Sequence, residues 1–372
     1  MHRRLLALVA VGLFTLSGTA ACSDDGDTAD AIPVRGGDGT GKVGVILPDT
    51  TTSQRWGSDD PKLLKAAFDA ADVPVEIENA QGDAAKFKAI GDKMIADGAT
   101  VLLIANLDPD SGKYVLDKAR ANGVKTIDYD RLTLNGGADY YVSFDNVKVG
   151  ELQAKGLISC LKAKKIKTPK IAFLNGSPTD NNATLFKEGA DNILQPYFDS
   201  GEFLKGPDQA VADWKKEEAL TVFREMFNQT TGQISGDISG VLAANDTLGN
   251  EAIALLRERN KAGQVPVTGQ DAELQGLQNI LAGDQCMTVY KPIKQEADAA
   301  AALAIDLFKG GKVEVDERVK DVESGAFIPA KLLTPKSIMK KDVNVVIKDG
   351  FVTKKALCAG RFADPCKEAG IR

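Results

Sequence analysis

Short apolar runs alternate with amphipathic stretches along the first third of this 372-residue chain, and that alternation most constrains its fold. Runs as short as Val101–Ile104 are typical of buried strands, whereas apolar residues three and four positions apart are typical of helices. The predicted strands are 42–47, 73–77, 101–104 and 124–127, and the predicted helices are 60–71, 84–96 and 111–121. Strict alternation of this kind predicts a parallel sheet with helices on both faces.

The same pattern then starts again. The second series has predicted helices at 147–161, 184–197, 214–228, 247–259 and 274–282, and predicted strands at 170–174, 240–243, 265–267 and 287–290. An Ala-rich helix at 293–308 is expected to return to the first unit, and a further strand is expected at 343–347. The fold class is therefore α/β, with two doubly wound lobes and a cleft between them.

Crossings at about 142–146 and near 290–292 define the expected domains. The first lobe comprises 42–143 plus about 292–325, and the second comprises 144–291 plus about 326–372 with the C-terminal tail. A chain with 43% hydrophobic and 26% charged residues has an ordinary globular composition with room for two domains. Its net charge of −6 and the lack of a basic stripe argue against nucleic-acid binding.

Residues 1–22 have the pattern of an export signal. Arg3 and Arg4 precede an apolar core at 5–16, which is too short to span a bilayer stably. Thr19-Ala20-Ala21-Cys22 resembles a bacterial lipobox, so Cys22 is the predicted lipidation site; a plain secretory signal is the alternative. Residues 23–41 are acidic and poor in large apolar residues, as in a flexible tether. We therefore expect an exported lipoprotein anchored to the outer face of the bacterial cytoplasmic membrane.

Export permits disulfides among the cysteines that follow Cys22. The short spacing between Cys358 and Cys366 favours that pair, but four cysteines allow three pairings. Cys160 lies on a predicted apolar helix among Leu157, Ile158 and Leu161, so a buried free thiol is an alternative to a disulfide for this residue. The only histidine is His2, inside the signal, which excludes histidine-dependent nucleophilic catalysis and most zinc sites in the mature chain. No metal or cofactor is expected.

Polar residues follow the predicted strands in both halves. Because ligands of open α/β sheets bind at the carboxyl ends of strands, these positions are the candidate binding residues. The candidates are Arg55, Trp56, Asp130, Arg131, Asp180, Asn182, Trp214, Asn245, Asp271 and Lys291. Asp130 offers acceptors and Arg131 a fork of donors, so the pair suits adjacent hydroxyls. Trp56 and Trp214, one from each half, could hold a sugar ring between them.

Several long, ordered segments in 42–351 resemble periplasmic sugar-binding proteins of ABC importers, which have the type I or Venus-flytrap fold, and among them the D-xylose-binding proteins. These segments are YDRLTLNGGADYYVSFDNVKVGELQAKGL, GSPTDNNATLFKEGA, LAANDTLGNEAI, TGQDAEL and MTVYKPI. The resemblance implies a monomeric carrier, not an enzyme. It also implies that Arg55, Asp130 and Arg131 bind sugar from the first lobe and that Trp56 and Trp214 stack on the two ring faces. The residues that it places in the second lobe and the hinge are Asp180, Asn182, Asn245, Asp271 and Lys291.

The predicted function is capture of an aldose, D-xylose or a related monosaccharide, and its delivery to an ABC permease and its ATPase. An alternative is a sensor lipoprotein that presents bound sugar to a receptor or kinase. A carboxylate-based glycosidase that uses Asp130 and Asp271 is disfavoured, because both acids have cationic or amide neighbours that would keep them ionised.

Overall fold

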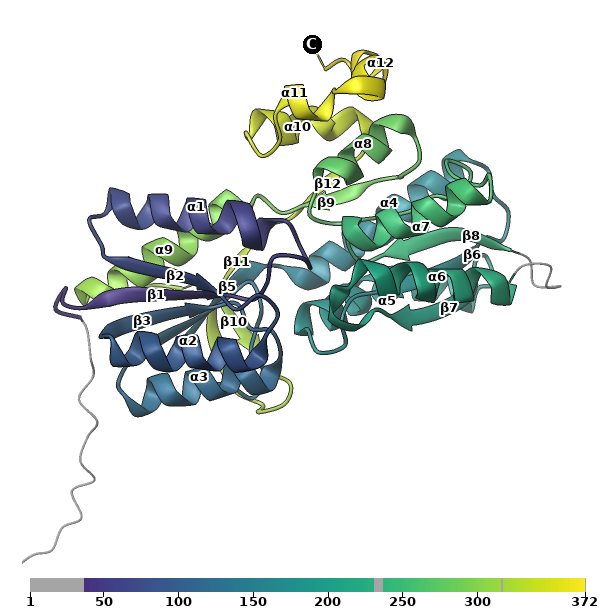
Figure 1. Ribbon diagram of the computed structural model, residues 1–372. Helices are drawn as coiled ribbons and strands as arrows, with labels where there is room; N and C mark the ends of the chain where they lie inside the picture. The colour runs from purple at the N-terminus through teal and green to yellow at the C-terminus, as the bar shows by residue number, and fades with distance from the viewer. Residues whose placement is uncertain (1–36, 231–236, 316, 372) are drawn as a thin grey trace, which may run out of the picture. The chain divides into compact units, whose positions relative to one another are not determined.

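The computed structural model describes residues 37–230, 237–315 and 317–371 (Figure 1). The predicted signal, Cys22 and most of the predicted tether lie outside these ranges. The end of that tether is fixed, because the backbone N–H groups of Gly37 and Gly39 donate to the Phe308 carbonyl at 3.2 and 3.1 Å. None of the helices within the described ranges is long and apolar enough to cross a membrane.

The first lobe contains a seven-stranded sheet in the order β10-β11-β5-β4-β3-β1-β2. Its strands are β1 (Lys42–Leu47), β2 (Val75–Asn79), β3 (Ala99–Ile104), β4 (Lys125–Tyr129), β5 (Tyr140–Phe144), β10 (Glu317–Lys320) and β11 (Phe327–Leu333). All neighbouring pairs are parallel except β10 with β11. The sheet therefore places the ends of β1 and β4 at the same edge.

Helices cover both faces of this sheet (Figure 1). One face packs against α1 (Arg55–Ala70) and α9 (Ile293–Lys309), and the other against α2 (Ala84–Ala96) and α3 (Pro109–Ala121). In β3, Val101 and Leu103 join the first core, whereas Leu102 and Ile104 join the second. Side chains alternate between the faces of a strand, which explains why a strand covered on both faces is a continuous apolar run.

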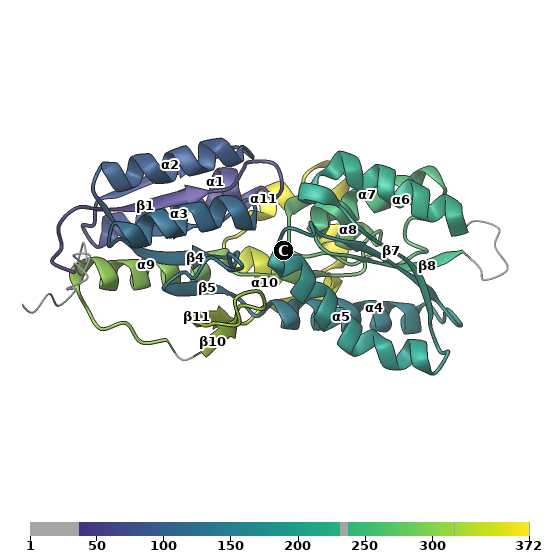
Figure 2. The same cartoon turned by 90° about the horizontal axis from the view of Figure 1, so that it is seen from below.

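The second lobe has a parallel sheet in the order β7-β6-β8. Its strands are β6 (Lys170–Asn175), β7 (Leu204–Ala210) and β8 (Ile238–Ala243), with β9 (Thr288–Tyr290) and β12 (Lys336–Ile338) pairing nearby. Its helices are α4 (Asn146–Ala163), α5 (Asn181–Asp199), α6 (Lys216–Thr230), α7 (Asp246–Glu258) and α8 (Leu274–Ala282). Figure 2 shows the strands between α6 and α7 on one side and α4 and α5 on the other.

Three connections link the lobes: β5 to α4, β9 to α9, and β11 to β12. The third crossing corrects the expected domain boundary near residue 325. Residues 327–333 form β11, which pairs with β5 in the first sheet, so the chain enters the second lobe only after Leu333. This strand was not anticipated, because Pro329 and Lys331 interrupt its apolar pattern.

Two predicted elements of the second half differ in the structure, and one strand was not predicted. Residues 265–267 form only a single bridge, between Val267 and Val241. Trp214 lies in the short turn η1 (Ala212–Trp214), and α6 begins at Lys216. The edge strand β7 was not predicted, because its sequence LKGPDQA has little apolar character.

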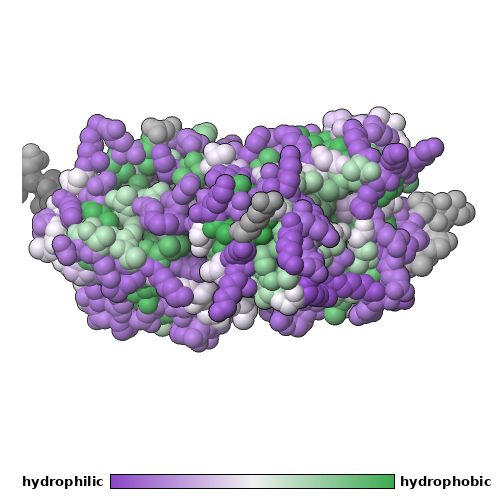
Figure 3. Space-filling view, turned by 90° about the horizontal axis from the view of Figure 1, so that it is seen from above, coloured by the Kyte–Doolittle hydropathy of each residue, from purple (hydrophilic) through white to green (hydrophobic). Residues whose placement is uncertain are grey.

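The C-terminal segment is helical and packs on α8. It comprises η2 (Lys340–Asp342), α10 (Val343–Lys348), α11 (Lys354–Leu357), η3 (Gly360–Phe362) and α12 (Ala363–Glu368). The strand predicted at 343–347 is thus a helix, in which Val343 and Val346 are buried one turn apart against the core of α8. Figure 3 shows the side on which this segment lies, where hydrophilic residues cover most of the surface and hydrophobic patches are small.

Two disulfides join the four described cysteines. Cys358 is bonded to Cys366, as the spacing favoured, and the bond closes a short loop in the C-terminal segment. Cys160 is bonded to Cys286 instead of forming a buried free thiol, which ties α4 to the chain just before β9.

Candidate functional site

The carboxyl ends of strands from both lobes surround one cavity of about 340 Å³, including its open mouth. All the predicted binding residues line it: Arg55, Trp56, Asp130, Arg131, Asp180, Asn182, Trp214, Asn245, Asp271 and Lys291. Thr52, Ser53, Phe186 and Gln270 complete the lining.

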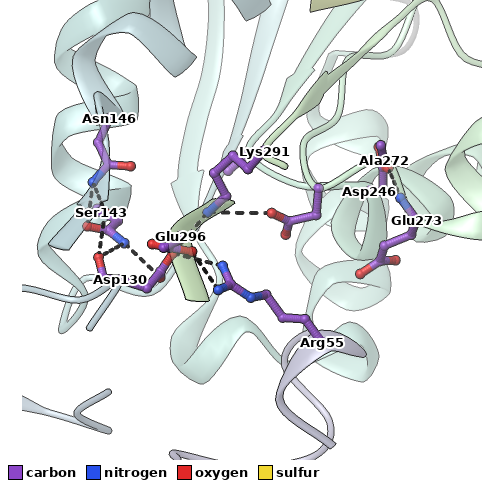
Figure 4. A network of polar contacts seen from close by, with 12 residues as sticks. Arg55, Asp130, Ser143, Asn146, Asp246, Ala272, Glu273, Lys291 and Glu296 are labelled. Carbon is purple, nitrogen blue, oxygen red and sulfur yellow. Dashed lines mark hydrogen bonds and ion pairs between the residues drawn. The ribbon is translucent and has the colours of Figure 1, made fainter. Parts of the chain in front are cut away.

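Arg55 is the centre of a buried ion network in the first lobe (Figure 4). Its guanidinium donates to Asp60 Oδ2 at 2.8 Å, to Asp130 Oδ2 at 2.9 Å and to Glu296 Oε2 at 2.6 Å. Burial alone would lower the Arg55 pKa, but the three carboxylates outweigh burial and raise it. Arg55 therefore stays charged and positions Asp130, with few donors left for a ligand.

Asp130 occupies a constrained position at the end of β4. Its backbone has a φ of 63°, in the left-handed region, and its carbonyl accepts hydrogen bonds from Ser143 Oγ at 2.8 Å and Tyr141 Oη at 3.0 Å. Local strain of this kind is typical of functional positions that their surroundings hold in place. Asp130 therefore presents its carboxylate to the cavity in a fixed direction.

Three cationic side chains keep Asp130 ionised. Burial alone would raise its pKa, but Lys291, Arg55 and Arg131 together lower it to about 2. Lys291 Nζ lies 3.3 Å from Asp130 Oδ2 and 3.5 Å from Asp271 Oδ1, and these anions raise the Lys291 pKa in spite of its burial. Lys291 thus connects the carboxylates of the two lobes.

Hydrogen bonds join the lobes across the cavity. Asn182, at the start of α5, donates from Nδ2 to the Asp130 carbonyl at 3.0 Å. Arg131 Nε lies 3.2 Å from Asp180 Oδ2, which also accepts from Trp214 Nε1 at 3.1 Å. Arg131 is held from its own lobe as well, because its Nη1 donates to the Asn106 carbonyl at 3.0 Å.

Three buried polar atoms of the cavity lining have no hydrogen-bond partner in the described part of the chain. They are Trp56 Nε1, Gln270 Oε1 and Asp271 Oδ1; the last has only the longer ion-pair contact with Lys291. An unsatisfied buried donor or acceptor costs about 1–3 kcal/mol. A ligand with several hydroxyl groups would provide the missing donors and acceptors.

The two tryptophans lie in different environments. The Arg55 guanidinium lies 4.3 Å from the centre of the Trp56 ring, whereas the Trp214 ring packs edge-on to Phe186 at 6.5 Å. Gly176 is required beside Trp214, because a Cβ at that position would lie 2.0 Å from the indole. Both rings border the cavity, although Arg55 already occupies one side of Trp56.

Sequence reasoning missed Gln270, Asp60 and Glu296. Gln270 directly precedes Asp271 at the same strand end, so the rule that selected Asp271 would also have selected Gln270. Glu296 is fully buried on the apolar face of α9, and a lone acid among Ile293, Ala297 and Ala300 is the corresponding signal. Asp60 accepts hydrogen bonds from Arg55 and Tyr129. No sequence motif links these three residues, so the sequence contained no signal for Asp60.

A cavity at the strand ends between two α/β lobes with three connections defines a two-lobed solute-binding protein. The model of the periplasmic binding protein domain matches residues 43–312. The D-xylose-binding periplasmic protein of Haemophilus influenzae is 36% identical over 85% of this chain and 92% of its own, and that of Escherichia coli is 36% identical over 83% and 90%. A solved ABC transporter solute-binding protein from Clostridium phytofermentans, with bound β-D-glucose, has a TM-score of 0.78 and 28% identity over 85% of this chain and 99% of its own.

The chain therefore belongs to the periplasmic binding protein family, which confirms the predicted type I fold. Members of this family bind solutes outside the cytoplasm and are not enzymes, so the glycosidase alternative is excluded.

Proposed function

We propose that this protein is the solute-binding component of a sugar ABC importer and that it binds an aldose, D-xylose or a close relative, in the cavity between its lobes. The observation that carries the proposal is the set of buried polar atoms that lack a hydrogen-bond partner among the described residues, in a cavity lined by anionic, cationic and aromatic side chains from both lobes. The D-xylose-binding relatives and the glucose-bound structure support an aldose as the ligand.

The first lobe and the hinge would bind one side of the sugar. Asp130 would accept from two neighbouring hydroxyls, while Lys291 and Arg131 would donate to sugar oxygens. Arg131 already pairs with Asp180, and Lys291 with Asp130. Each cation would donate to the sugar and keep its ion pair with the carboxylate. Trp56 would contact the ring and donate from its free Nε1 to a sugar oxygen.

The second lobe would bind the opposite side. Asn245 uses its Oδ1 to accept from Leu248 N–H at 2.9 Å, as the N-cap of α7, which leaves its amide Nδ2 for a ligand. Gln270 Oε1 and Asp271 Oδ1 would accept from hydroxyls, and Asp180 and Asn182 would bind near the crossing to the first lobe. Trp214 would pack against the apolar C–H face of the ring.

Because the sugar would contact residues of both lobes, closure of the two lobes would depend on the bound sugar. A sugar that touches both lobes binds the closed arrangement better than an open one, so it shifts the population towards closure. The closed form would then deliver the sugar to the permease and its ATPase. A hydroxyl missing from a competing sugar would leave a buried charged group unpaired, which is where discrimination between sugars would arise.

Calorimetric titration, followed in parallel by tryptophan fluorescence, tests the proposal. We expect one xylose or related aldose per chain to bind below millimolar concentration and to change the fluorescence of Trp56 and Trp214. Failure of xylose, glucose, arabinose, galactose and ribose to bind below millimolar concentration would refute an aldose-binding function.

We also propose that lipid on Cys22 anchors the protein to the outer face of the cytoplasmic membrane. The support is the sequence Thr19-Ala20-Ala21-Cys22 after an export-type apolar core. In a bacterial host that processes lipoproteins, the natural chain should label with radioactive palmitate and sediment with membranes. A Cys22→Ser variant should lose the label and appear in the soluble exported fraction; equal distribution of the two forms would exclude the anchor.

A further inference from the structure

A second cavity, of about 950 Å³ with its open mouth, lies beside the central one. We call it the lateral cavity. One wall runs from Ser53 into the first turns of α1, as far as Lys62. The others are Glu273 and Leu274, where α8 begins, and the C-terminal stretch from Phe351 to Ala356. Ser53, Arg55 and Asp271 line both cavities, so the two spaces adjoin along one seam between the lobes.

Among the residues that the structure describes, no polar contact joins the two sides of this seam directly, although Lys291 bridges Asp130 and Asp271 beside it. Ser53 and Arg55 come from the first lobe and Asp271 from the second, and no hydrogen bond or ion pair joins them across it. Asp271 Oδ1 has no hydrogen-bond partner on either side. A ligand that extends from the central cavity through this seam would therefore break no direct bond of Ser53 or Arg55 with Asp271.

The C-terminal wall of the lateral cavity is rigidly held. Gln278 Nε2, on α8, donates to the Ala356 carbonyl at 3.3 Å, and the Phe351 and Tyr290 rings lie 5.4 Å apart. The disulfide between Cys358 and Cys366 follows directly after α11 and fixes the end of this wall. A preformed wall loses little entropy on binding, which favours a binding site over a loose surface gap.

The chemistry of the lateral cavity matches a sugar ring. Phe351 provides an aromatic face for the apolar C–H side of a ring, and Asp59 and Glu273 provide carboxylate acceptors for hydroxyls. Glu273 accepts only from Thr247 Oγ1, at 3.0 and 3.2 Å, and no cation pairs with it within the described ranges. The charged lining comprises Asp59, Asp271 and Glu273 together with Lys62 and Arg55, and Arg55 is already paired with three other carboxylates. The excess of negative charge disfavours an anionic ligand, and a purely apolar ligand would bury carboxylates unpaired.

The geometry points to a subsite for the second unit of a neutral disaccharide, whose first ring occupies the central cavity. This inference rests on the proposed function, because it requires a sugar in the central cavity. It extends the ligand class from free aldoses to glycosides of aldoses, and it gives the C-terminal helices a role in recognition.

Calorimetry with four probes tests the subsite: D-xylose, D-glucose and their β-1,4-linked homodisaccharides, xylobiose and cellobiose. We expect the disaccharide of the preferred aldose to bind with an affinity equal to or higher than that of the aldose itself. If the aldose binds but neither disaccharide does, the subsite is refuted and the proposed function stands. If none of the four binds, the proposed function fails together with the subsite.

Two variants assign the effect to the lateral cavity. Phe351→Ala should weaken disaccharide binding by about fivefold or more, because it removes a ring contact. Glu273→Gln conserves shape and should weaken it by about threefold or more, because a neutral amide oxygen accepts a weaker hydrogen bond than a carboxylate. Aldose affinity should stay within about twofold in both. Phe327→Ala is the matched control, since Phe327 is 56% exposed on β11 outside both cavities.

If Phe351→Ala disturbs the packing on Tyr290, Glu273→Gln still tests the subsite, because the contact between the Phe351 and Tyr290 rings does not involve Glu273. Equal losses of aldose and disaccharide affinity in Glu273→Gln would contradict a separate subsite, as would unchanged disaccharide affinity in both variants.

Discussion

The first-lobe wall and the second-lobe wall of the central cavity differ in how their buried polar groups are hydrogen-bonded. In the first lobe, Arg55 binds three carboxylates, and this ion network is complete without a ligand, apart from one oxygen of Glu296. Trp56 Nε1 lies outside the network and has no hydrogen-bond partner among the described residues. In the second lobe, Gln270 and Asp271 present buried oxygens that have no hydrogen-bond partner in the described structure. The difference indicates that the first lobe is organised before the sugar arrives, whereas the second lobe gains its missing hydrogen bonds from the sugar.

Substitution of Asp130 should have the largest effect, because Asp130 belongs to the organised wall and also faces the ligand. Asp130→Asn would leave Arg55 and Lys291 with less buried negative charge, so we expect a loss of about 3–5 kcal/mol in the free energy of unfolding. Sugar affinity should fall by about 100-fold or more. Urea unfolding and calorimetry measure the two effects.

The control for Asp130→Asn is Asp117→Asn, which removes a surface carboxylate that pairs with Lys113 and Arg120. Its effect should be below about 1 kcal/mol. If Asp130→Asn were as stable as the natural protein, the first wall would not be the buried network described above.

Arg131→Ala tests the contact between the walls. Arg131 reaches Asp180 across the cavity, and its loss should abolish ligand-induced closure while the fold stays intact. We expect sugar affinity to fall by about ten- to 100-fold, the range of one or more charged hydrogen bonds. Small-angle scattering with and without sugar reports closure, and near-natural affinity in this variant would show that Arg131 is not part of the clamp.

Gln270→Ala tests the second wall by itself. Since Gln270 Oε1 has no partner in the described chain, its removal should leave the free energy of unfolding unchanged or slightly raised. Sugar affinity should fall by about five- to 30-fold, because the ligand loses one buried hydrogen bond. Gln278→Ala, on α8 and bonded to the C-terminal helices, is the matched change outside the cavity and should leave affinity unaltered. A clear loss of stability in Gln270→Ala would contradict the contrast between the walls.

A smaller, pH-dependent effect on the free energy of unfolding is expected from Asp128, which lies on β4 two residues before Asp130. Asp128 accepts from Thr133 N–H at 2.7 Å and from its hydroxyl at 2.8 Å, and burial raises its pKa to about 7. A carboxyl with a raised folded-state pKa binds its proton more tightly in the folded chain. Its contribution to stability is therefore present at pH 4 and lost as the pH rises towards and through 7.

Asp128→Asn removes that titration. The difference in unfolding free energy between Asp128→Asn and the natural protein should therefore shift in favour of the variant between pH 5 and pH 8. Urea unfolding at both values measures the shift, and a difference independent of pH would show that Asp128 does not titrate in this range.

The strand-helix pattern predicted the α/β class and placed the predicted binding residues, which the structure brings together in one cavity. This worked because parallel strands deliver their carboxyl ends to one edge, so sequence position after an apolar run determines location. Pairing partners remote in sequence were not predictable in this way. Glu296 meets Arg55 only because α9 returns to the first lobe, and β11 pairs with β5 although its sequence has no clean alternation.

The same limit applies to the C-terminal segment. Val343 and Val346 form part of a helix, because α8 offers an apolar face that their local sequence does not reveal. The pairing of Cys160 with Cys286 likewise depends on the approach of α4 to β9 in three dimensions.

A crystal structure of the protein with its preferred aldose tests the central claim most directly. We expect one sugar between the lobes, with hydroxyls within hydrogen-bond distance of Asp130 from the first lobe and of Gln270 Oε1 and Asp271 Oδ1 from the second. The bonds among Arg55, Asp60 and Glu296 should be unchanged. A sugar bound outside this cavity, or one that contacts a single lobe and leaves Gln270 and Asp271 without partners, would contradict it.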